Sequence, residues 1–225
     1  MSEAIPAIRL RIKFAKEGAL RYIGHLDLHH IWQRSIRRAG LPLIYSQGFH
    51  PQPKIQIASA LPLGFSSRAE FVDIWISPEA EYSVEGLQKN LPEGIKVSSI
   101  EEVDLRAPAL QTQGDYAEYE VTILDDIPAD ELDKRLASLM DAESLPREKK
   151  RKKRGKVRTY DLRALILDLH RLLPPEGEGW DGGERIYMRF VSREGATGRP
   201  DMILKEMEIP IEAARVERTA LVFKS

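Results

Sequence analysis

The densest group of side chains that could do chemistry lies between residues 21 and 71, which read RYIGHLDLHHIWQRSIRRAGLPLIYSQGFHPQPKIQIASALPLGFSSRAEF. Basic and aromatic residues recur here more often than the packing of a core requires. Guanidinium groups bind anionic oxygens through charge-assisted hydrogen bonds, and aromatic rings offer flat faces to unstacked bases. The stretch therefore suits a surface that binds a large anion.

The first part of this stretch is predicted to form a helix over residues 26–39, which Gly40 and Pro42 end. Its apolar residues recur at spacings of three and four and form one stripe: Leu28, Ile31, Trp32, Ile36 and Ala39. Off that stripe lie His30, Arg34, Arg37 and Arg38. Because Arg34 and Arg38 are one turn apart, both can reach one phosphate backbone. The alternative is a solvated face with local ion pairs.

A loop rich in turn-forming residues follows over residues 46–54, with the sequence SQGFHPQPK. Gly48 permits a close approach of the backbone to a ligand, and Phe49 offers a ring for stacking. His50 and Lys54 can contact an anion. Two prolines stiffen the loop and lower the entropic cost of binding, so we expect it to contribute to a nucleic-acid site.

A second basic segment covers residues 147–158, REKKRKKRGKVR. Nine basic residues and one acidic residue give it +8, which leaves −9 for the rest of a chain whose net charge is −1. Such a density of like charge stays solvated unless a polyanion neutralises it. Predicted nucleic-acid contacts here are Lys150, Arg151, Lys153 and Arg154. The alternative is a hairpin tip that keeps a strand edge soluble.

The histidines of the first segment could bind a metal or transfer protons. His25 and His29 are four residues apart, a spacing that can place two imidazoles on one metal. No HExxH pattern or thiolate supports such a site, so no metal and no cofactor are predicted. Either His25 or His50 could act as a general acid or base in RNA cleavage, with the RNA's own 2′-OH as nucleophile. No phosphate-binding P-loop, dinucleotide fingerprint or serine nucleophile elbow is present.

The composition narrows the class of protein. The 225 residues include no cysteine, which excludes disulfides, thiol catalysis and iron–sulfur ligation within the chain. No signal peptide is visible, and no apolar run approaches the roughly 18 residues that span a bilayer. The expected location is the cytoplasm.

Alternation and helical periodicity predict an α+β protein with two tandem ferredoxin-like (split βαβ) domains and antiparallel sheets. The first domain covers residues 1–108 and carries the 21–71 segment. The second, more divergent domain covers residues 109–225 and carries the basic run, with 107–114 as the linker. Periodicity does not decide between helix and strand for residues 159–173.

In a split βαβ unit both helices cover one face of the sheet and leave the other open. Alternation places these residues on the open side of the first domain: Arg9, Arg11, Lys13, Lys54, Gln56, Phe71, Asp73 and Trp75. In the second domain Arg185, Tyr187 and Arg189 point the same way. Interleaved cations and rings suit single-stranded RNA. The alternative is that the open faces pack together or form ion pairs through Asp73 and Glu120.

The blocks RYIGHLDL, RSIRRAGLPLIYSQGFHPQPKI and ALPLGFSSRAEFVDI resemble the radical-SAM-linked family of unknown function. Its members stand alone or are fused C-terminal to radical SAM proteins. The resemblance implies a radical SAM enzyme as partner, since this chain has no CxxxCxxC motif of its own. A weaker, fold-level likeness is to the tandem ferredoxin-like RNA-processing endonucleases of CRISPR systems, although their glycine-rich C-terminal loop is missing here.

The expected function is that of a non-catalytic, RNA-binding accessory that recognises substrate for a radical SAM modification enzyme. Two alternatives come from other classes. One is a metal-independent ribonuclease that uses His25 or His50. The other is a protein–protein adaptor that docks a radical SAM enzyme without contacting RNA.

Overall fold

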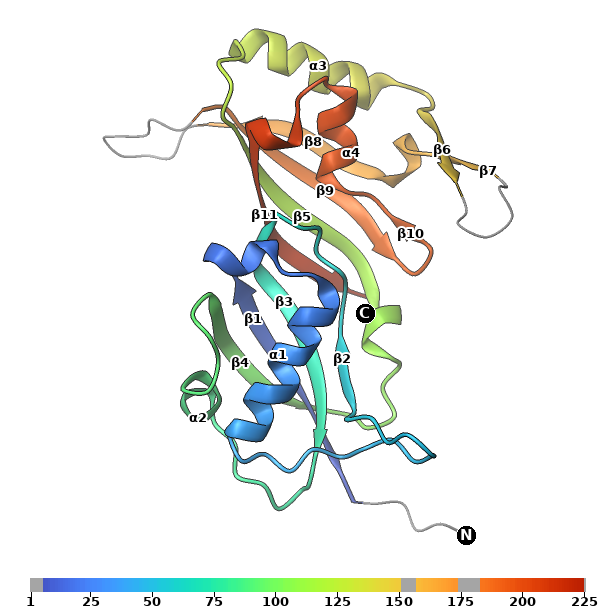
Figure 1. Cartoon of the computed structure of the whole chain (residues 1–225). Helices are drawn as coiled ribbons and strands as arrows, with labels where there is room; N and C mark the ends of the chain where they lie inside the picture. The colour runs from blue at the N-terminus through green and yellow to red at the C-terminus, as the bar shows by residue number, and fades with distance from the viewer. Residues whose placement is uncertain (1–5, 151–156, 174–182, 225) are drawn as a thin grey trace. The chain divides into compact units, whose positions relative to one another are not determined.

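The computed structural model describes residues 6–150, 157–173 and 183–224 (Figure 1). The chain divides into two compact units. Unit 1 comprises Met1–Gly114 with Lys224–Ser225, and unit 2 comprises Asp115–Phe223. Both are mixed α+β, with antiparallel strand pairs and few helices. Among the described residues, no helix combines the length and the apolar character needed to cross a membrane.

Unit 1 places a four-stranded sheet against helix α1 (Figure 1). Its elements are β1 (Ile8–Lys16), the 3-10 helix η1 (Gly18–Tyr22), α1 (His25–Arg38), β2 (Ile55–Ile57), β3 (Ser66–Ile76), α2 (Val84–Gln88), β4 (Ile95–Val103) and the 3-10 helix η2 (Leu110–Thr112). The strand order is β4-β1-β3-β2. All three pairings are antiparallel, so each strand runs opposite to its neighbours.

The core of unit 1 lies between α1 and the sheet. The strand residues that alternation predicts to face the helices are buried: Leu10, Ile12, Phe14, Ile55, Ile57, Val72, Ile74 and Ile76. The ring of Phe14 meets Trp32 of α1 edge to face, with 4.8 Å between ring centroids. Aromatic pairs in this geometry add about 0.5–1.5 kcal/mol beyond the area they bury. The helix is therefore held with one fixed face outward.

The open face of this sheet differs from the sequence prediction. Arg9 and Asp73 are buried, and the Arg9 Nε donates to the Asp73 carboxylate at 2.8 Å. Arg11 donates to the same carboxylate, at 2.9 Å. Arg9 also donates to two backbone carbonyls, those of Ala107 (2.7 Å) and Pro108 (3.0 Å). The segment after β4 thus lies against this face. Because Arg9 and Arg11 are engaged in these contacts, neither is available to RNA. The alternative of ion pairing through Asp73 is confirmed.

The two lysines predicted on that face, Lys13 and Lys54, are exposed to solvent. The Lys13 ammonium lies 6.0 Å from the Phe71 ring centroid. Gln56 accepts from the Leu110 backbone N–H at 3.0 Å, which fixes η2 beside β2. Between α1 and β2 the chain forms two isolated bridges, Leu43 with Ile76 and Tyr45 with Pro53.

Unit 2 repeats the order of strands and helices, with an added hairpin. Its elements are β5 (Gly114–Ile123), α3 (Ala129–Asp141), β6 (Pro146–Lys150), β7 (Val157–Asp161), the 3-10 helix η3 (Arg163–Leu165), β8 (Ile166–Leu172), β9 (Arg185–Arg193), β10 (Ala196–Thr197), α4 (Pro200–Glu206), the 3-10 helix η4 (Ile211–Ala213) and β11 (Ala214–Phe223). The sheet order is β11-β5-β9, with both β8 and β10 pairing with β9. The hairpin of β6 and β7 forms a separate sheet.

One face of the unit 2 sheet packs on α3 and α4. Its buried residues alternate along β5 and β9: Ala117, Tyr119, Val121, Ile186, Met188 and Phe190. Leu132, Leu136 and Leu139 of α3 and Ile203 and Leu204 of α4 are buried with them. Arg171 of β8 donates to both oxygens of Asp133 on α3 at 2.9 Å, which ties helix to strand. The opposite face carries polar and aromatic side chains.

Candidate nucleic-acid interface

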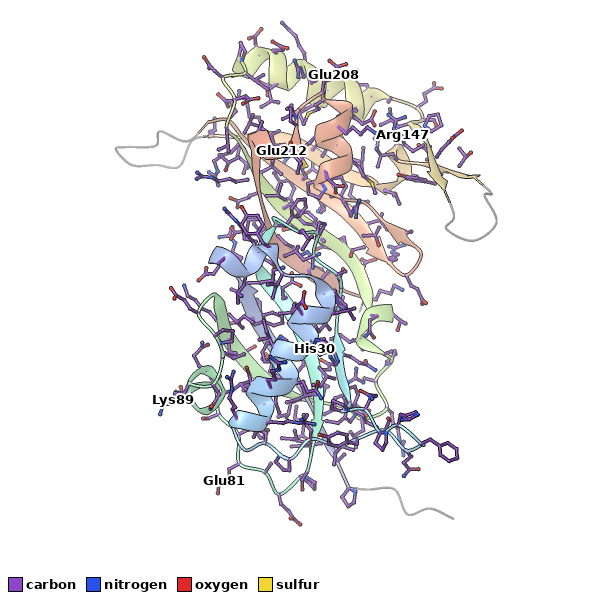
Figure 2. The ribbon with its side chains drawn as sticks, viewed as in Figure 1. His30, Glu81, Lys89, Arg147, Glu208 and Glu212 are labelled. Carbon is purple, nitrogen blue, oxygen red and sulfur yellow. The ribbon has the colours of Figure 1, made fainter. Side chains whose placement is uncertain are left out.

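Helix α1 presents a basic face to solvent. Leu28, Trp32, Ser35 and Ile36 are buried against the sheet. The side chains of His30, Arg34, Arg37 and Arg38 are exposed on the other side, and Figure 2 labels His30 among them. Arg37 and Arg38 lie in the last turn, where the helix dipole favours cations. The structure therefore brings together the four helix residues that the sequence predicts.

The three arginines differ in how firmly they are held. Arg37 donates to the Tyr45 hydroxyl at 2.7 Å. Arg38 donates to the Asn90 carbonyl at 2.8 Å and to the Ser35 hydroxyl at 3.2 Å. Within the described part of the chain, the Arg34 side chain makes no hydrogen bond or ion pair. A guanidinium has five N–H donors, so Arg37 and Arg38 keep donors for phosphate while their positions are fixed.

The loop after α1 is closed at its base by its own hydrogen bonds. The Ser46 N–H donates to the Gln52 carbonyl at 2.8 Å, and the Gln52 N–H returns a bond to the Ser46 hydroxyl at 2.9 Å. Tyr45 and Pro53 form a bridge, and the Lys54 N–H donates to the Ile44 carbonyl at 2.8 Å. These contacts define the ends of the loop without covering its tip.

The tip of this loop exposes the residues that could contact a ligand. Phe49 is fully exposed, and His50 and Lys54 are exposed as well. Gly48 has φ of 140°, a conformation that residues with a side chain rarely adopt. An exposed phenylalanine forgoes about 1.5–3 kcal/mol of burial. A bound base could recover part of that free energy.

Tyr45 connects the helix to the loop, and the sequence did not indicate it. Its hydroxyl accepts from Arg37, and its backbone forms the bridge at the base of the loop. The basic face of α1 and the loop are therefore parts of one surface in unit 1, which we call the α1–loop surface: His30, Arg34, Arg37, Arg38, Tyr45, Phe49, His50 and Lys54. A tyrosine between an apolar pair and a proline-rich loop has no distinctive spacing, so no local pattern could have identified it.

The basic run of residues 147–158 belongs to unit 2. Arg147, labelled in Figure 2, pairs with Glu206 of α4, and its Nε donates to that carboxylate at 2.6 Å. The backbone of Lys150 pairs with that of Val157 at the end of the hairpin. The predicted contacts Arg151, Lys153 and Arg154 lie outside the described residues.

The histidines lie on α1 and in the loop. His25 is the first residue of α1 and is exposed, whereas His29 is half-buried. The rings of His29 and His30 are 6.3 Å apart. Within residues 6–150, 157–173 and 183–224, no three histidines or carboxylates gather closely enough to hold a metal ion.

His29 gives unit 1 a dependence on pH. Burial lowers the pKa of His29 below its ordinary value of 6.5, and the charges of His30 and His25 lower it further. A hydrogen bond with the Ile55 backbone raises the pKa, but its effect is smaller than that of burial. The neutral form is thus favoured in the folded state. Its stabilising contribution is complete above pH 6.5 and is lost as the pH falls below that value towards the lowered pKa.

We expect His29→Gln to remove this pH dependence. Between about pH 7 and pH 5.5, the wild-type protein should lose more free energy of unfolding than the variant, as measured by urea titration at each pH. Equal losses in the two proteins would show that His29 titrates alike in the folded and unfolded states.

Two of the solved structures that match the chain do so at low sequence identity. A chain of a Cbf5-Nop10-Gar1 complex is 12% identical over 94% of this chain and 48% of its own length, with a TM-score of 0.47. This chain thus spans about half of that protein. An unknown protein from Galdieria sulphuraria is 12% identical over 96% of this chain and 99% of its own, with a TM-score of 0.26. Neither likeness is strong enough to indicate a shared fold.

No curated protein matches the chain. Residues 9–200 match the family described as "Uncharacterized protein conserved in bacteria (DUF2344)". The match includes the whole α1–loop surface and all unit 2 strands from β5 to β10. Because it covers well over half of the sequence, the chain belongs to this family of uncharacterised bacterial proteins.

Proposed function

We propose that this protein is an RNA-binding accessory that presents RNA to a modification enzyme in the cytoplasm. One observation carries the proposal: Arg37 of the basic helix face donates at 2.7 Å to Tyr45, at the base of the loop that exposes Phe49. The α1–loop surface thus combines the cationic side chains of α1 with the exposed ring of Phe49.

The chemistry of this surface suits single-stranded RNA. Guanidinium groups at three- and four-residue spacings on one helix side can bind successive phosphates, and backbone contacts of this kind position RNA without reading its sequence. An exposed ring then stacks on an unpaired base, which every base allows. Double-stranded RNA would leave Phe49 without a base to stack on, so the proposal commits to single strands.

The fold and the partner belong to the same proposal. We infer that each unit is a split βαβ, ferredoxin-like domain, and the order β4-β1-β3-β2 of unit 1 supports this. The corresponding order β11-β5-β9-β8 supports it for unit 2. The radical SAM enzyme as partner rests on the sequence resemblance of residues 21–73, and the chain would supply RNA recognition to it.

Crosslinking in cells, followed by sequencing of the RNA bound to the protein, tests this function. We expect RNA recovery well above that of a variant with Arg34, Arg37 and Arg38 all changed to Ala. Recovery at background, together with co-purification of a radical SAM enzyme, would replace the proposal by the adaptor alternative. RNA that is cleaved by the wild type but not by His50→Ala would replace it by the ribonuclease alternative.

Changing Phe49 should weaken RNA binding without changing the number of phosphates bound. Loss of one stacked base costs about 1–3 kcal/mol, so Phe49→Ala should raise the Kd for a single-stranded oligonucleotide roughly tenfold, measured by fluorescence anisotropy. Phe49→Tyr keeps the ring and should bind like the wild type. Leu105→Ala removes another exposed apolar side chain of unit 1 and serves as the control. An unchanged Kd in Phe49→Ala would exclude stacking at this tip.

A further inference from the structure

The helix-free face of the unit 2 sheet carries an ordered set of rings and charges. Its side chains alternate with the buried ones along three strands and are half-buried or exposed: Tyr116, Glu118 and Glu120 on β5, Asp168 and His170 on β8, and Arg185, Tyr187 and Arg189 on β9. Strands β5 and β8 flank β9, so β9 is the middle strand of this group. Neither the α1–loop surface nor the basic run includes any of these residues.

Strand register arranges these side chains in two rows across the sheet. In the first row Tyr187 lies between His170 and Glu120. In the second row Arg189 lies between Asp168 and Glu118. Directly opposed residues have Cβ atoms about 4.5–5.5 Å apart, so the members of each row are in reach of one another.

The rings of the first row are already assembled. His170 and Tyr187 stack with 4.8 Å between ring centroids and 29° between ring planes. The His170 side chain is 51% exposed, so the pair is open to solvent on the His170 side. Burial, followed by a hydrogen bond with Glu118, raises the pKa of Tyr187 to about 12. The phenol therefore stays neutral at any working pH, and its ring position is fixed by a charged partner.

The charges around this ring pair do not favour phosphate. Arg185 pairs with Glu120, and Arg189 lies over the Tyr116 ring at 5.6 Å, between two carboxylates. Among these eight side chains three are carboxylates and two are arginines. Each carboxylate already has a partner: Glu120 pairs with Arg185, Glu118 is hydrogen-bonded to Tyr187, and Asp168 lies 3.3 Å from the His170 Nδ1. Carboxylate oxygens accept hydrogen bonds from the N–H groups of nucleobases, whereas they repel phosphate.

We propose that His170 and Tyr187 form a stacking site for an unpaired nucleobase of single-stranded RNA. The flat ring pair supplies the contact area, and the lone pairs that the neighbouring carboxylates keep beside their present partners can accept from the base edge. The middle strands of four-stranded α+β sheets carry stacking aromatics in one common class of RNA-binding domain, which shows that such a face can accept bases. This inference rests on the proposed function, but it assigns a second stacking site on a different surface.

An oligonucleotide with 2-aminopurine at one position tests the site, because stacking quenches the fluorescence of this base. We expect His170→Ala and Tyr187→Leu to weaken binding about tenfold and to relieve quenching at one position along the oligonucleotide. Tyr187→Phe keeps the ring and should restore both. His170 is half exposed, so its variant is expected to fold even if Tyr187→Leu does not. Glu194→Ala, at an exposed turn, is the control.

The salt dependence separates this site from the α1–loop surface. Stacking releases no counterions, so the slope of log K against log salt should be the same in His170→Ala as in the wild type. If His170→Ala binds with wild-type affinity and quenching while the arginine variants lose affinity, the stacking site is refuted and the proposed function stands. If only His170→Ala loses affinity, the stacking site stands and the α1–loop surface fails. A wild-type protein that binds no RNA refutes both.

Discussion

Asp73→Asn is expected to destabilise unit 1 by about 3–5 kcal/mol, the cost of removing one partner from a buried ion pair. Asp73 is fully buried and is the carboxylate shared by Arg9, itself 1% exposed, and Arg11. The asparagine keeps the volume of the side chain but leaves two guanidinium groups without a counter-charge. Urea unfolding, read as the free energy of unfolding, measures the effect.

Two further variants make this result specific. Asp126→Asn makes the same chemical change at an exposed position and should alter the free energy of unfolding by no more than about 0.5 kcal/mol. Adding Arg9→Met to Asp73→Asn should recover part of the loss, because it removes an unpaired buried charge. A loss below about 1 kcal/mol in Asp73→Asn would mean that water, rather than the carboxylate, stabilises these arginines.

Changing Arg34, Arg37 and Arg38 together to Ala should weaken binding of single-stranded RNA roughly 50-fold at about 0.15 M salt. Each neutralised phosphate on a single strand contributes about 0.7 to the slope of log K against log salt, which is roughly a fourfold change in affinity per contact at this concentration. The fold should survive, since all three side chains are exposed. Their hydrogen bonds to Tyr45, Asn90 and Ser35 are worth only about 1 kcal/mol each.

A matched control separates local contacts from overall charge. Lys89, Arg106 and Lys205 are also exposed, and changing all three to Ala lowers the net charge by the same amount. Figure 2 labels Lys89 beside α2. We expect this control to retain affinity within about threefold. Equal losses in the two triple variants would mean that charge alone, rather than the α1–loop surface, drives binding.

Much of the secondary structure could be predicted from periodicity. A spacing of three and four predicted the first helix to within one residue at each end, since the predicted range was 26–39 and α1 covers His25–Arg38. The buried positions follow from the same patterns, because a strand with one covered face must alternate. Residues of the helix that lie off the apolar stripe were predicted to be exposed, and the structure exposes them: His30, Arg34, Arg37 and Arg38.

The covered open face of unit 1 could not be predicted in this way. Alternation assigns Arg9 and Asp73 to one face of the sheet but says nothing about what lies on that face. The segment after β4 covers it through the Ala107 and Pro108 carbonyls, a contact across nearly a hundred residues. Buried charges were thus mistaken for surface charges, because local pattern carries no information about distant backbone acceptors.

Periodicity does not decide between helix and strand for residues 159–173, for a related reason. They form the end of β7, a 3-10 turn at η3 and the strand β8, so two short strands meet in one apolar stretch. Each strand is selected by a different partner, β6 for one and β9 for the other. Short apolar runs fit helix and strand alike until the partner strand is known.

The salt dependence of RNA affinity tests the central claim most directly. The wild-type protein should bind a single-stranded oligonucleotide with log K falling linearly against log salt, and the slope should shrink by about 2 in the variant with Arg34, Arg37 and Arg38 changed to Ala. That decrease equals three phosphate contacts. A wild-type slope near zero, or one that the triple variant leaves unchanged, would contradict the assignment of the α1–loop surface to RNA.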